Sequence, residues 1–256
     1  MNKDKFRYWL DFNIALAFKE IKARYKYTVF GFLWMFLNPV LQMLVIGFVF
    51  RFFVPVRVDN YFLFLFSGLL IWNFFSISIT RATPMFVYER SLIQKAKFPR
   101  EAIILSIIFS NLFHFVISIF LLLIFVFLTS SVSVKGLLLL PVIVVWLTIL
   151  TSAFSLIFAS LNVRFRDVNF LIQAIMPIWF YATPVMYTIN LLPKNLYWLF
   201  HLNPMTSLVE LMRYSILNIP LSNSTFLISG LFITILILII SMKYFKKENI
   251  YFDDWL

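Results

Sequence analysis

The amino-acid sequence predicts an all-α integral membrane protein. We expect six transmembrane helices, an N-terminal amphipathic interfacial helix, and two short re-entrant helices between spans five and six. Six stretches of the 256-residue chain, each 20 residues or longer, contain no charged side chain. A helix needs about 20 mostly apolar residues to cross the hydrocarbon core, and a charge placed there is costly. Within one membrane domain, residues 1–256, the predicted spans are residues 28–50, 61–80, 103–129, 137–161, 168–187 and 225–242.

The positively charged side chains indicate the orientation of these spans. Of the 22 Lys and Arg residues, 17 lie in the gaps at residues 1–27, 81–101, 164–167 and 243–256. Cytoplasmic loops are the ones enriched in Lys and Arg. We therefore expect both termini to be cytoplasmic, in a multi-pass protein of a bacterial or archaeal cytoplasmic (inner) membrane.

The composition excludes several classes of protein. The chain is 62% hydrophobic with a mean hydropathy of +0.92, well above a soluble domain. The net charge of +11 is divided among short loops, which favours membrane lipids over nucleic acid as a partner. The absence of cysteine excludes a thiolate nucleophile or metal site, and the two histidines lie in different segments.

No motif for covalent chemistry occurs in the sequence. The chain contains no G-x-x-x-x-G-K-[ST] phosphate loop, no H-E-x-x-H and no G-x-S-x-G, and the predicted spans contain no Asp or Glu. We therefore expect no catalytic residue, metal or cofactor in this chain. Transport driven by protons or sodium usually needs an ionisable group within the membrane. If the protein moves a substrate uphill, a partner must supply the energy.

Residues 8–26 form the predicted interfacial helix. Apolar side chains recur along one helical face, at Leu10, Ile14, Ala17, Ile21 and Tyr25. Glu20 and Arg24 have the i,i+4 spacing of an ion pair on a helix. An amphipathic, basic helix ahead of a span is expected to lie in the membrane interface. The alternative is a charged anchor that only sets the topology.

Two further segments are not predicted to cross the membrane. Residues 87–98 combine basic and apolar side chains in a short helix that ends before Pro99. This segment is either a solvated loop or a helix that docks a cytoplasmic partner. Residues 194–217 are apolar but interrupted at Asn203-Pro204, so each piece is too short to cross. We expect two short re-entrant helices there, with their turn shielded by protein or facing water.

Several groups of residues occur in the order typical of one transporter family. They are residues 22–27 with 29–34 and Asn38-Pro39, residues 92–101, residues 161–168, and residues 183–187 with 202–204. In these groups, spread over nearly the whole chain, the sequence resembles the membrane subunit of ABC-2-type exporters. It is most similar to the permeases that export polyprenyl-linked polysaccharides such as O antigen or teichoic acid. The resemblance implies a homodimer, two copies of a cytoplasmic ABC ATPase that binds ATP and Mg, and a polyprenyl-linked glycan substrate.

The resemblance also implies roles for particular segments. Residues 87–98 would be a coupling helix seated in the ATPase, and residues 8–26 a gate helix at the lateral cytoplasmic entrance. Spans one and five would line a channel with aromatic belts. The residues implied in ATPase coupling are Glu89, Arg90, Ser91, Leu92, Lys95, Lys97, Phe98, Pro99 and Arg100.

Two further sets of residues are candidates for contact with such a substrate. Aromatic faces stack on the apolar hydrogens of sugar rings, and the candidate path residues are Phe32, Trp34, Phe36, Trp179, Phe180 and Tyr181. Three arginines can donate charge-assisted hydrogen bonds to a lipid-linked pyrophosphate or can bind bulk anionic lipid. These are Arg24, Arg164 and Arg166.

The sequence therefore predicts a transport subunit rather than an enzyme. The predicted function is the permease of an ATP-driven exporter that moves a lipid-linked polysaccharide from the cytoplasmic to the outer side of the inner membrane. An ABC-2 permease for drugs or lipids is the alternative. An integral-membrane glycosyl- or acyltransferase is a third interpretation, for which Asp59, Asp167 and Glu210 are the only candidate acids near an interface.

Overall fold

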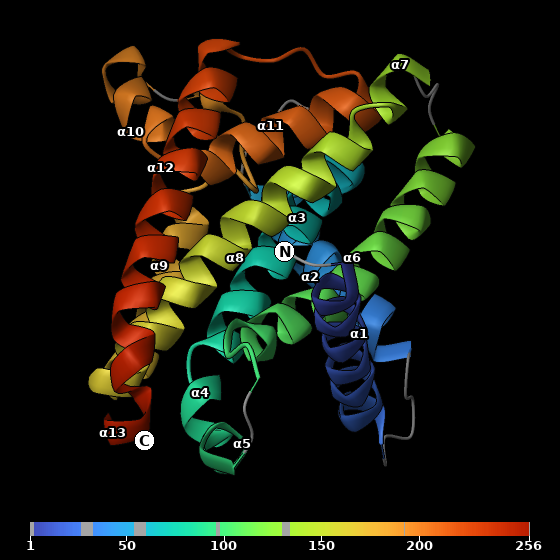
Figure 1. The fold of residues 1–256 in the computed structure, drawn as a ribbon. Coiled ribbons are helices and arrows are strands. Elements are labelled where there is room, and N and C mark those ends of the chain that lie inside the picture. Colours follow the sequence, from blue (N-terminus) through green and yellow to red (C-terminus); the bar gives the residue numbers. More distant parts are fainter. Residues whose placement is uncertain are drawn as a thin grey trace.

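A computed structural model describes residues 3–26, 33–53, 60–95, 98–129, 134–191 and 193–255, and every regular element in these ranges is helical. Figure 1 shows the helices as an elongated bundle, with α5 and α13 at one end and α7 and α10 at the other. The α-helices are α1 Lys3–Tyr25, α2 Trp34–Phe53, α3 Tyr61–Ala82, α4 Met85–Tyr88, α5 Arg90–Lys95, α6 Glu101–Thr129, α7 Val134–Leu137, α8 Leu140–Arg164, α9 Val168–Tyr181, α10 Tyr197–His201, α11 Pro204–Leu217, α12 Thr225–Glu248 and α13 Phe252–Trp255. Short 3₁₀ turns are η2 Ile189–Leu191, η3 Lys194–Leu196 and η4 Asn249–Tyr251.

Four described helical runs are long and apolar enough to cross a membrane. They are Tyr61–Tyr88, Glu101–Thr129, Leu140–Arg164 and Thr225–Tyr251, and they correspond to predicted spans two, three, four and six. The apolar runs at the predicted spans one and five are shorter, at Leu37–Phe50 and Val168–Tyr181. A helix rises about 1.5 Å per residue, so the 14 residues of α9 cover about 21 Å of a hydrocarbon core about 30 Å thick.

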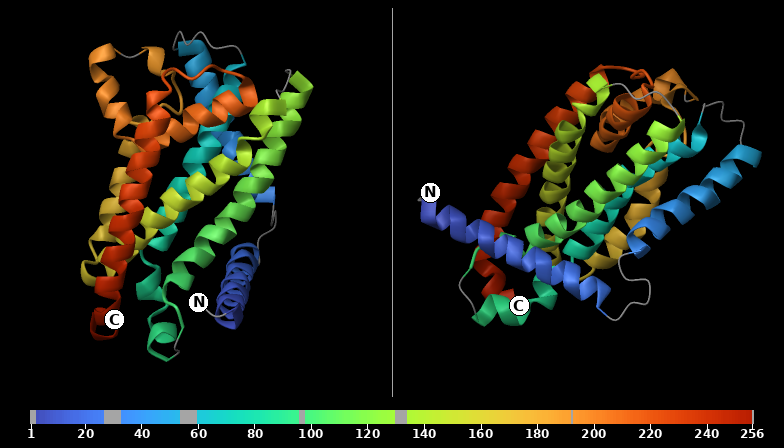
Figure 2. Two further views of the ribbon diagram at one scale, coloured as in Figure 1. Left: turned by 45° about the horizontal axis from the view of Figure 1, so that its top comes forward. Right: turned by 90° about the vertical axis from the view of Figure 1, so that its right-hand side faces the viewer.

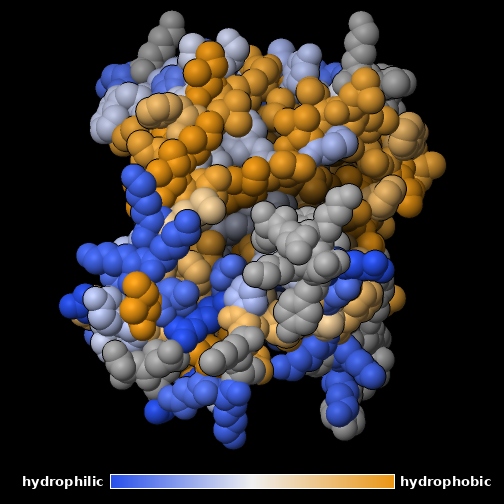
Figure 3. Space-filling view, viewed as in Figure 1, coloured by the Kyte–Doolittle hydropathy of each residue, from blue (hydrophilic) through white to orange (hydrophobic). Residues whose placement is uncertain are grey.

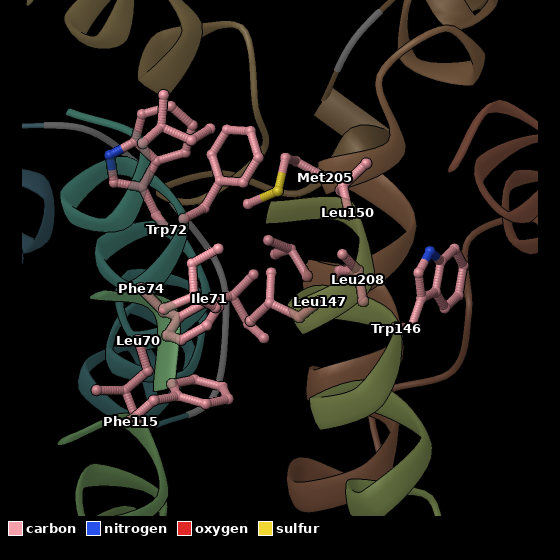
Figure 4. Close-up of a cluster of buried hydrophobic side chains, with 14 of the residues drawn as sticks. Leu70, Ile71, Trp72, Phe74, Phe115, Trp146, Leu147, Leu150, Met205 and Leu208 are labelled. Atoms are coloured by element: carbon pink, nitrogen blue, oxygen red, sulfur yellow. The ribbon is translucent and has the colours of Figure 1, made fainter. Parts of the chain in front are cut away.

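Helix α3 lies at the centre of the bundle. It packs against α2, α6, α8 and α11, and most of its side chains are buried, as expected of a helix that is apolar on all sides. Figure 4 shows the core, in which Ile71 of α3 faces Leu147 of α8. Since lipid is as apolar as these side chains, close packing rather than the hydrophobic effect holds such helices together.

Local chemistry explains where two of the helices begin and end. The sequence predicted span five to residue 187, whereas α9 ends at Tyr181. Pro184 follows closely, and a residue before proline is disfavoured in the α conformation. Helix α11 begins at Pro204, whose missing N–H is not needed in the first turn, and the Asn203 side chain accepts a hydrogen bond from the Met205 N–H (3.1 Å). It ends at Leu217 and is followed by the capping residue Asn218, which adopts the left-handed conformation (φ 55°).

The N-terminal helix α1 lies across the bundle rather than along it (Figure 2). It packs against α6, with Asn13 and Ala17 buried in the contact. The predicted apolar face does not all point toward the protein, because Ile14 is 43% exposed. The side chains of Leu10 and Tyr25 lie outside the described part of the chain.

The loop between α3 and α6, residues 83–95 and 98–100, is called the α3–α6 loop below. The sequence predicted one helix over residues 87–98, but the structure has two short helices, α4 and α5, which meet at Glu89. The backbone of Glu89 (φ −92°, ψ 26°) departs from helical geometry and interrupts the helix. The predicted re-entrant region, residues 194–217, is likewise divided into η3, α10 and α11.

Candidate docking face and substrate path

The α3–α6 loop presents polar side chains at one end of the molecule. Phe86 and Ile93 are buried and fix α4 and α5 to the bundle, while Tyr88 is 70% exposed. The side chains predicted to couple to an ATPase include four that are exposed or partly exposed with polar groups outward, Glu89, Arg90, Ser91 and Lys95. Leu92 is half-buried, and Lys97 lies outside the described residues. Figure 3 shows hydrophilic side chains gathered at this end, below an apolar band.

Two ion pairs connect α1 to this loop and to the end of α3. Lys19 Nζ lies 3.3 Å from Glu89 Oε1, and Arg81 Nη2 lies 3.2 Å from Glu20 Oε2. Glu20 therefore pairs with α3; the Arg24 side chain, whose spacing on α1 predicts a pair with Glu20, lies outside the described part. Because Lys19 is 57% exposed, its pair contributes little to stability, typically below about 1 kcal/mol. The two pairs therefore help to set the direction of α1 but contribute little to the stability of its packing on the bundle.

The end of the α3–α6 loop turns inward instead of facing solvent. Phe98 packs on Phe12 of α1, with ring centroids 5.3 Å apart. Pro99 is half-buried beside it. Arg100 Nη1 donates to the carbonyl oxygen of Asn249 (2.6 Å) and to its side-chain oxygen (3.3 Å). Arg100 thus contacts the C-terminal segment, residues 249–255, within this chain.

Two arginines predicted to meet a pyrophosphate or lipid headgroup also contact the C-terminal segment. The Arg164 guanidinium lies 5.4 Å from the centroid of the Trp255 ring, and Arg166 Nη2 donates to the Trp255 carbonyl oxygen (3.5 Å). Both arginines remain exposed, so either can still reach an anionic group.

The six candidate path residues fall into three groups. Trp34 on α2 (41% exposed) and Tyr181 on α9 (66% exposed) lie on uncovered helix faces. Trp179 instead packs edge-on against Phe75 and Phe154 (5.1 and 5.2 Å), and Phe180 packs against Trp72 (5.5 Å). Phe32 and the Phe36 side chain lie outside the described part. Trp179 and Phe180 therefore attach α9 to α3 and α8.

An amide pair that the sequence did not indicate lies about two turns beyond Trp34 along α2. Gln42 Oε1 accepts a hydrogen bond from Asn73 Nδ2 (2.8 Å) across α2 and α3, at an exposed site. Asn38, one turn after Trp34 on α2, is also exposed. Exposed amides are costly against lipid tails, so this face of α2 suits water, a polar substrate or another protein surface better than lipid. The feature of the sequence that could have identified this face is the presence of Asn38 and Gln42 within an uncharged, mostly apolar run.

The segment after α9, residues 182–187, is held by side chains from other helices. The hydroxyl of Tyr61 donates to the Met186 carbonyl oxygen (2.8 Å), and Arg213 Nη2 donates to that of Val185 (2.7 Å). Asn203 Nδ2 donates to Thr183 Oγ1 (2.9 Å). Backbone carbonyls without helical partners are therefore satisfied inside the protein.

Arg213 is buried completely within this network. Its guanidinium stacks on Phe64, 3.4 Å from the ring centroid, and among the described residues its Nε and Nη1 atoms have no hydrogen-bond partner. Glu210 supplies an opposite charge nearby. Arg213 is one of the five Lys and Arg residues outside the four basic gaps, and no local pattern in the sequence marks it as buried.

The described residues contain no group of three or more His, Cys, Asp or Glu that could hold a metal ion. Several apolar helices long enough to cross a membrane define a multi-pass membrane protein. The family follows from sequence comparison: the chain belongs to the ABC-2 type transporter family, whose model matches residues 13–217.

Curated relatives cover nearly the same length. Two proteins of Klebsiella pneumoniae, both named O-antigen export system permease protein RfbA, are 33% and 31% identical over 249 and 252 residues. Each alignment covers 96% of this chain and 95% of the relative. A protein of the same name from Myxococcus xanthus is 35% identical over 200 residues, 77% of this chain and 76% of its own length.

Proposed function

We propose that this chain is the permease subunit of an ATP-driven exporter that moves a lipid-linked polysaccharide from the cytoplasmic to the outer side of the inner membrane. The names of the relatives support the class of substrate. The structural observation that carries the proposal is the exposed polar face of the α3–α6 loop, which is anchored by buried Phe86 and Ile93. Such a loop suits a cytoplasmic partner that pushes on it.

The partner is an ABC ATPase, in two copies on a homodimer of this chain. The ATPase binds the ATP and Mg, since the permease sequence has no phosphate loop. Arg90, Ser91 and Lys95 of α5 form the contact surface together with Tyr88. Arg100 does not face the ATPase but supports the loop from within the permease, because its guanidinium donates to Asn249.

Helix α1 is the gate helix beside the entrance. Lys19–Glu89 and the packing of Phe98 on Phe12 connect α1 to the α3–α6 loop, while Glu20–Arg81 connects it to the end of α3, so a displacement of the loop changes the position of α1. Exposed Ile14 and Phe18 on α1 face lipid tails at the interface.

The uncovered faces of α2 and α9 line the path. Trp34 and Tyr181 supply aromatic surfaces for sugar rings, and Asn38 and the Gln42–Asn73 pair supply hydrogen-bonding groups for hydroxyls. Arg24, Arg164 and Arg166 lie on the side where a pyrophosphate enters, as charge-assisted donors.

Six spans are completed by α2 and α9. The 20 residues of α2 cover about 30 Å. Helix α9 is shorter, but the segment that follows it is buried from Thr183 to Met186 and is bonded by Tyr61 and Arg213. Non-helical backbone is tolerated at membrane depth where protein covers it, so span five continues through this segment. Helices α10 and α11 then re-enter the outer leaflet without crossing.

The experiment reverses the charge of the proposed contact surface. The double variant Arg90→Glu/Lys95→Glu is expected to lose co-purification with the cytoplasmic ATPase and to lose polysaccharide at the cell surface, at unchanged permease abundance. Lys243→Glu/Lys247→Glu is the matched control, since both lysines are exposed on α12. If the α5 variant assembles and exports like the parent chain, the docking role of α5 is wrong.

A further inference from the structure

The C-terminal segment folds back against the inner end of the bundle. Phe252 is fully buried, with its ring centroid 5.0 Å from Phe86 of α4 and 6.1 Å from Phe245 of α12. Phe86 and Phe245 also stack on each other at 6.0 Å. Phe252 is therefore the third ring of a cluster that joins the α3–α6 loop to α12.

The same segment also holds the other end of the α3–α6 loop. Arg100, just before α6, donates to the main-chain and side-chain oxygens of Asn249, and its guanidinium lies 5.8 Å from the Phe252 ring centroid. Phe86 precedes α5 in the chain and Arg100 follows it. Both stems of the loop are thus fixed by one short stretch of chain.

A third set of contacts reaches the turn between α8 and α9. Trp255 receives the Arg166 hydrogen bond on its carbonyl oxygen and the Arg164 guanidinium over its ring. Tyr251 stacks on Trp255, with ring centroids 5.4 Å apart, so a second aromatic residue of the same segment packs against the Trp255 ring. The C-terminal segment therefore touches the loop, α12, the end of α8 and the turn between α8 and α9.

We infer that residues 249–255 are a positioning element, a clasp that sets the placement of the α3–α6 loop relative to α12 and the α8–α9 turn. Resting on the proposed function, the clasp transmits ATPase-driven movement of the loop to the α8–α9 turn, and through this turn to α9, which lines the path. Three arginines that the sequence assigned to ATPase or headgroup contact, Arg100, Arg164 and Arg166, act at least partly through it.

The experiment measures loop placement directly, in the full-length permease without ATPase or substrate. The chain has no cysteine, so spin labels can be attached at Gln94→Cys on α5 and Lys246→Cys on α12, which are both exposed. In Phe252→Ala, the distribution of distances between the two labels is expected to broaden or shift. Phe252→Leu, which keeps an apolar side chain, is expected to restore most of it.

The matched control is Ile250→Ala in the same segment, because Ile250 is 74% exposed. Its distance distribution is expected to equal that of the parent chain. Arg100→Lys is a milder second variant, usable if Phe252→Ala does not fold, and it is also expected to broaden the distribution. The clasp is refuted if Phe252→Ala or Arg100→Lys leaves the distribution unchanged, or if Ile250→Ala alters it as much.

A second readout separates the clasp from the proposed function. In cells that contain the partner ATPase, Phe252→Ala is expected to reduce surface polysaccharide while ATPase still co-purifies. If the label distances change as expected but no ATPase binds even the parent chain, the proposed function fails and the clasp stands. If distances change and export equals that of the parent, transmission through the clasp is wrong.

Discussion

At the scale of single residues, Arg213 shows how an arginine can be retained in an apolar setting. It is the largest fully buried side chain among the described residues. Its hydrogen bond goes to the Val185 carbonyl, which has no helical partner, and its planar face rests on Phe64. An isolated charge there would be costly, but an unsatisfied carbonyl at membrane depth is costly as well. Arg213 removes the cost of the unsatisfied carbonyl by donating to Val185, and the nearby Glu210 carboxylate reduces the cost of burying the charge.

We therefore expect Arg213→Met to lower the free energy of unfolding by about 3 kcal/mol, because it leaves the Val185 carbonyl and Glu210 without their cationic neighbour. The free energy of unfolding of Arg213→Lys should lie between those of Arg213→Met and the parent chain, since a lysine keeps the charge but loses the planar group that stacks on Phe64. The measurement is the unfolding midpoint of the purified full-length chain. Tyr214→Ala, at the next and 42% exposed position, should stay near the parent value. Equal midpoints for Arg213→Met and the parent chain would contradict this account.

At the scale of elements, the helices that the sequence predicted best are those with long uncharged runs. Helices α3, α6, α8 and α12 follow from length and hydropathy alone, because any long apolar run must satisfy its backbone as a helix. Their ends follow from local effects that hydropathy does not contain. The turn at Glu89 and the end of α9 at Tyr181 are such cases.

The candidate site was less predictable than the helices. A helix that is apolar all round does not reveal which face meets protein, so Trp179 and Tyr181 looked alike in the sequence. The structure packs the first and exposes the second. Long-range contacts, such as Arg100 with Asn249, leave no local sequence pattern at all.

The packing of α12 against α8 and α11 depends on one glycine. A Cβ at Gly230 would overlap Ser207 Oγ of α11, and it would lie 2.8 Å from Ser207 Cβ and 3.1 Å from Trp146 Cζ2 of α8. Alanine gains about 1 kcal/mol in helix propensity over glycine, but overpacking costs about 1–3 kcal/mol. Because the contact includes Ser207 Cβ, which no change of rotamer can move away, we expect the clash to dominate.

Gly230→Ala should therefore lower the unfolding midpoint of the purified chain, and the double variant Gly230→Ala/Ser207→Gly should recover part of the loss. Ile228→Ala, two positions away and 71% exposed, serves as the control with little expected change. A stabilised Gly230→Ala protein would show that helix propensity outweighs the contact, and that α12 can move away from Ser207.

At the scale of the whole molecule, the two ends of the bundle differ in the side chains that they expose. Figure 1 places α4, α5 and α13 at one end, and α7 and α10 at the other. The loop and C-terminal segment at the first end contain Arg90, Lys95 and Arg100, whereas the second end exposes apolar Trp198 and Leu202. Loops rich in Lys and Arg stay in the cytoplasm. The first end should accordingly be cytoplasmic.

This orientation gives opposite expectations for two single-cysteine variants of the cysteine-free chain. In intact cells, a membrane-impermeant maleimide should label Ser224→Cys, just before α12, but not Ile250→Cys, since these exposed positions lie at opposite ends of the bundle. After permeabilisation, both should be labelled to a similar extent, which controls for intrinsic reactivity. Tyr88→Cys on α4 should behave as Ile250→Cys does. If position 250 is labelled in intact cells, the predicted orientation is wrong. The cytoplasmic ATPase could then not reach α5 either, because α5 and position 250 lie at the same end of the bundle.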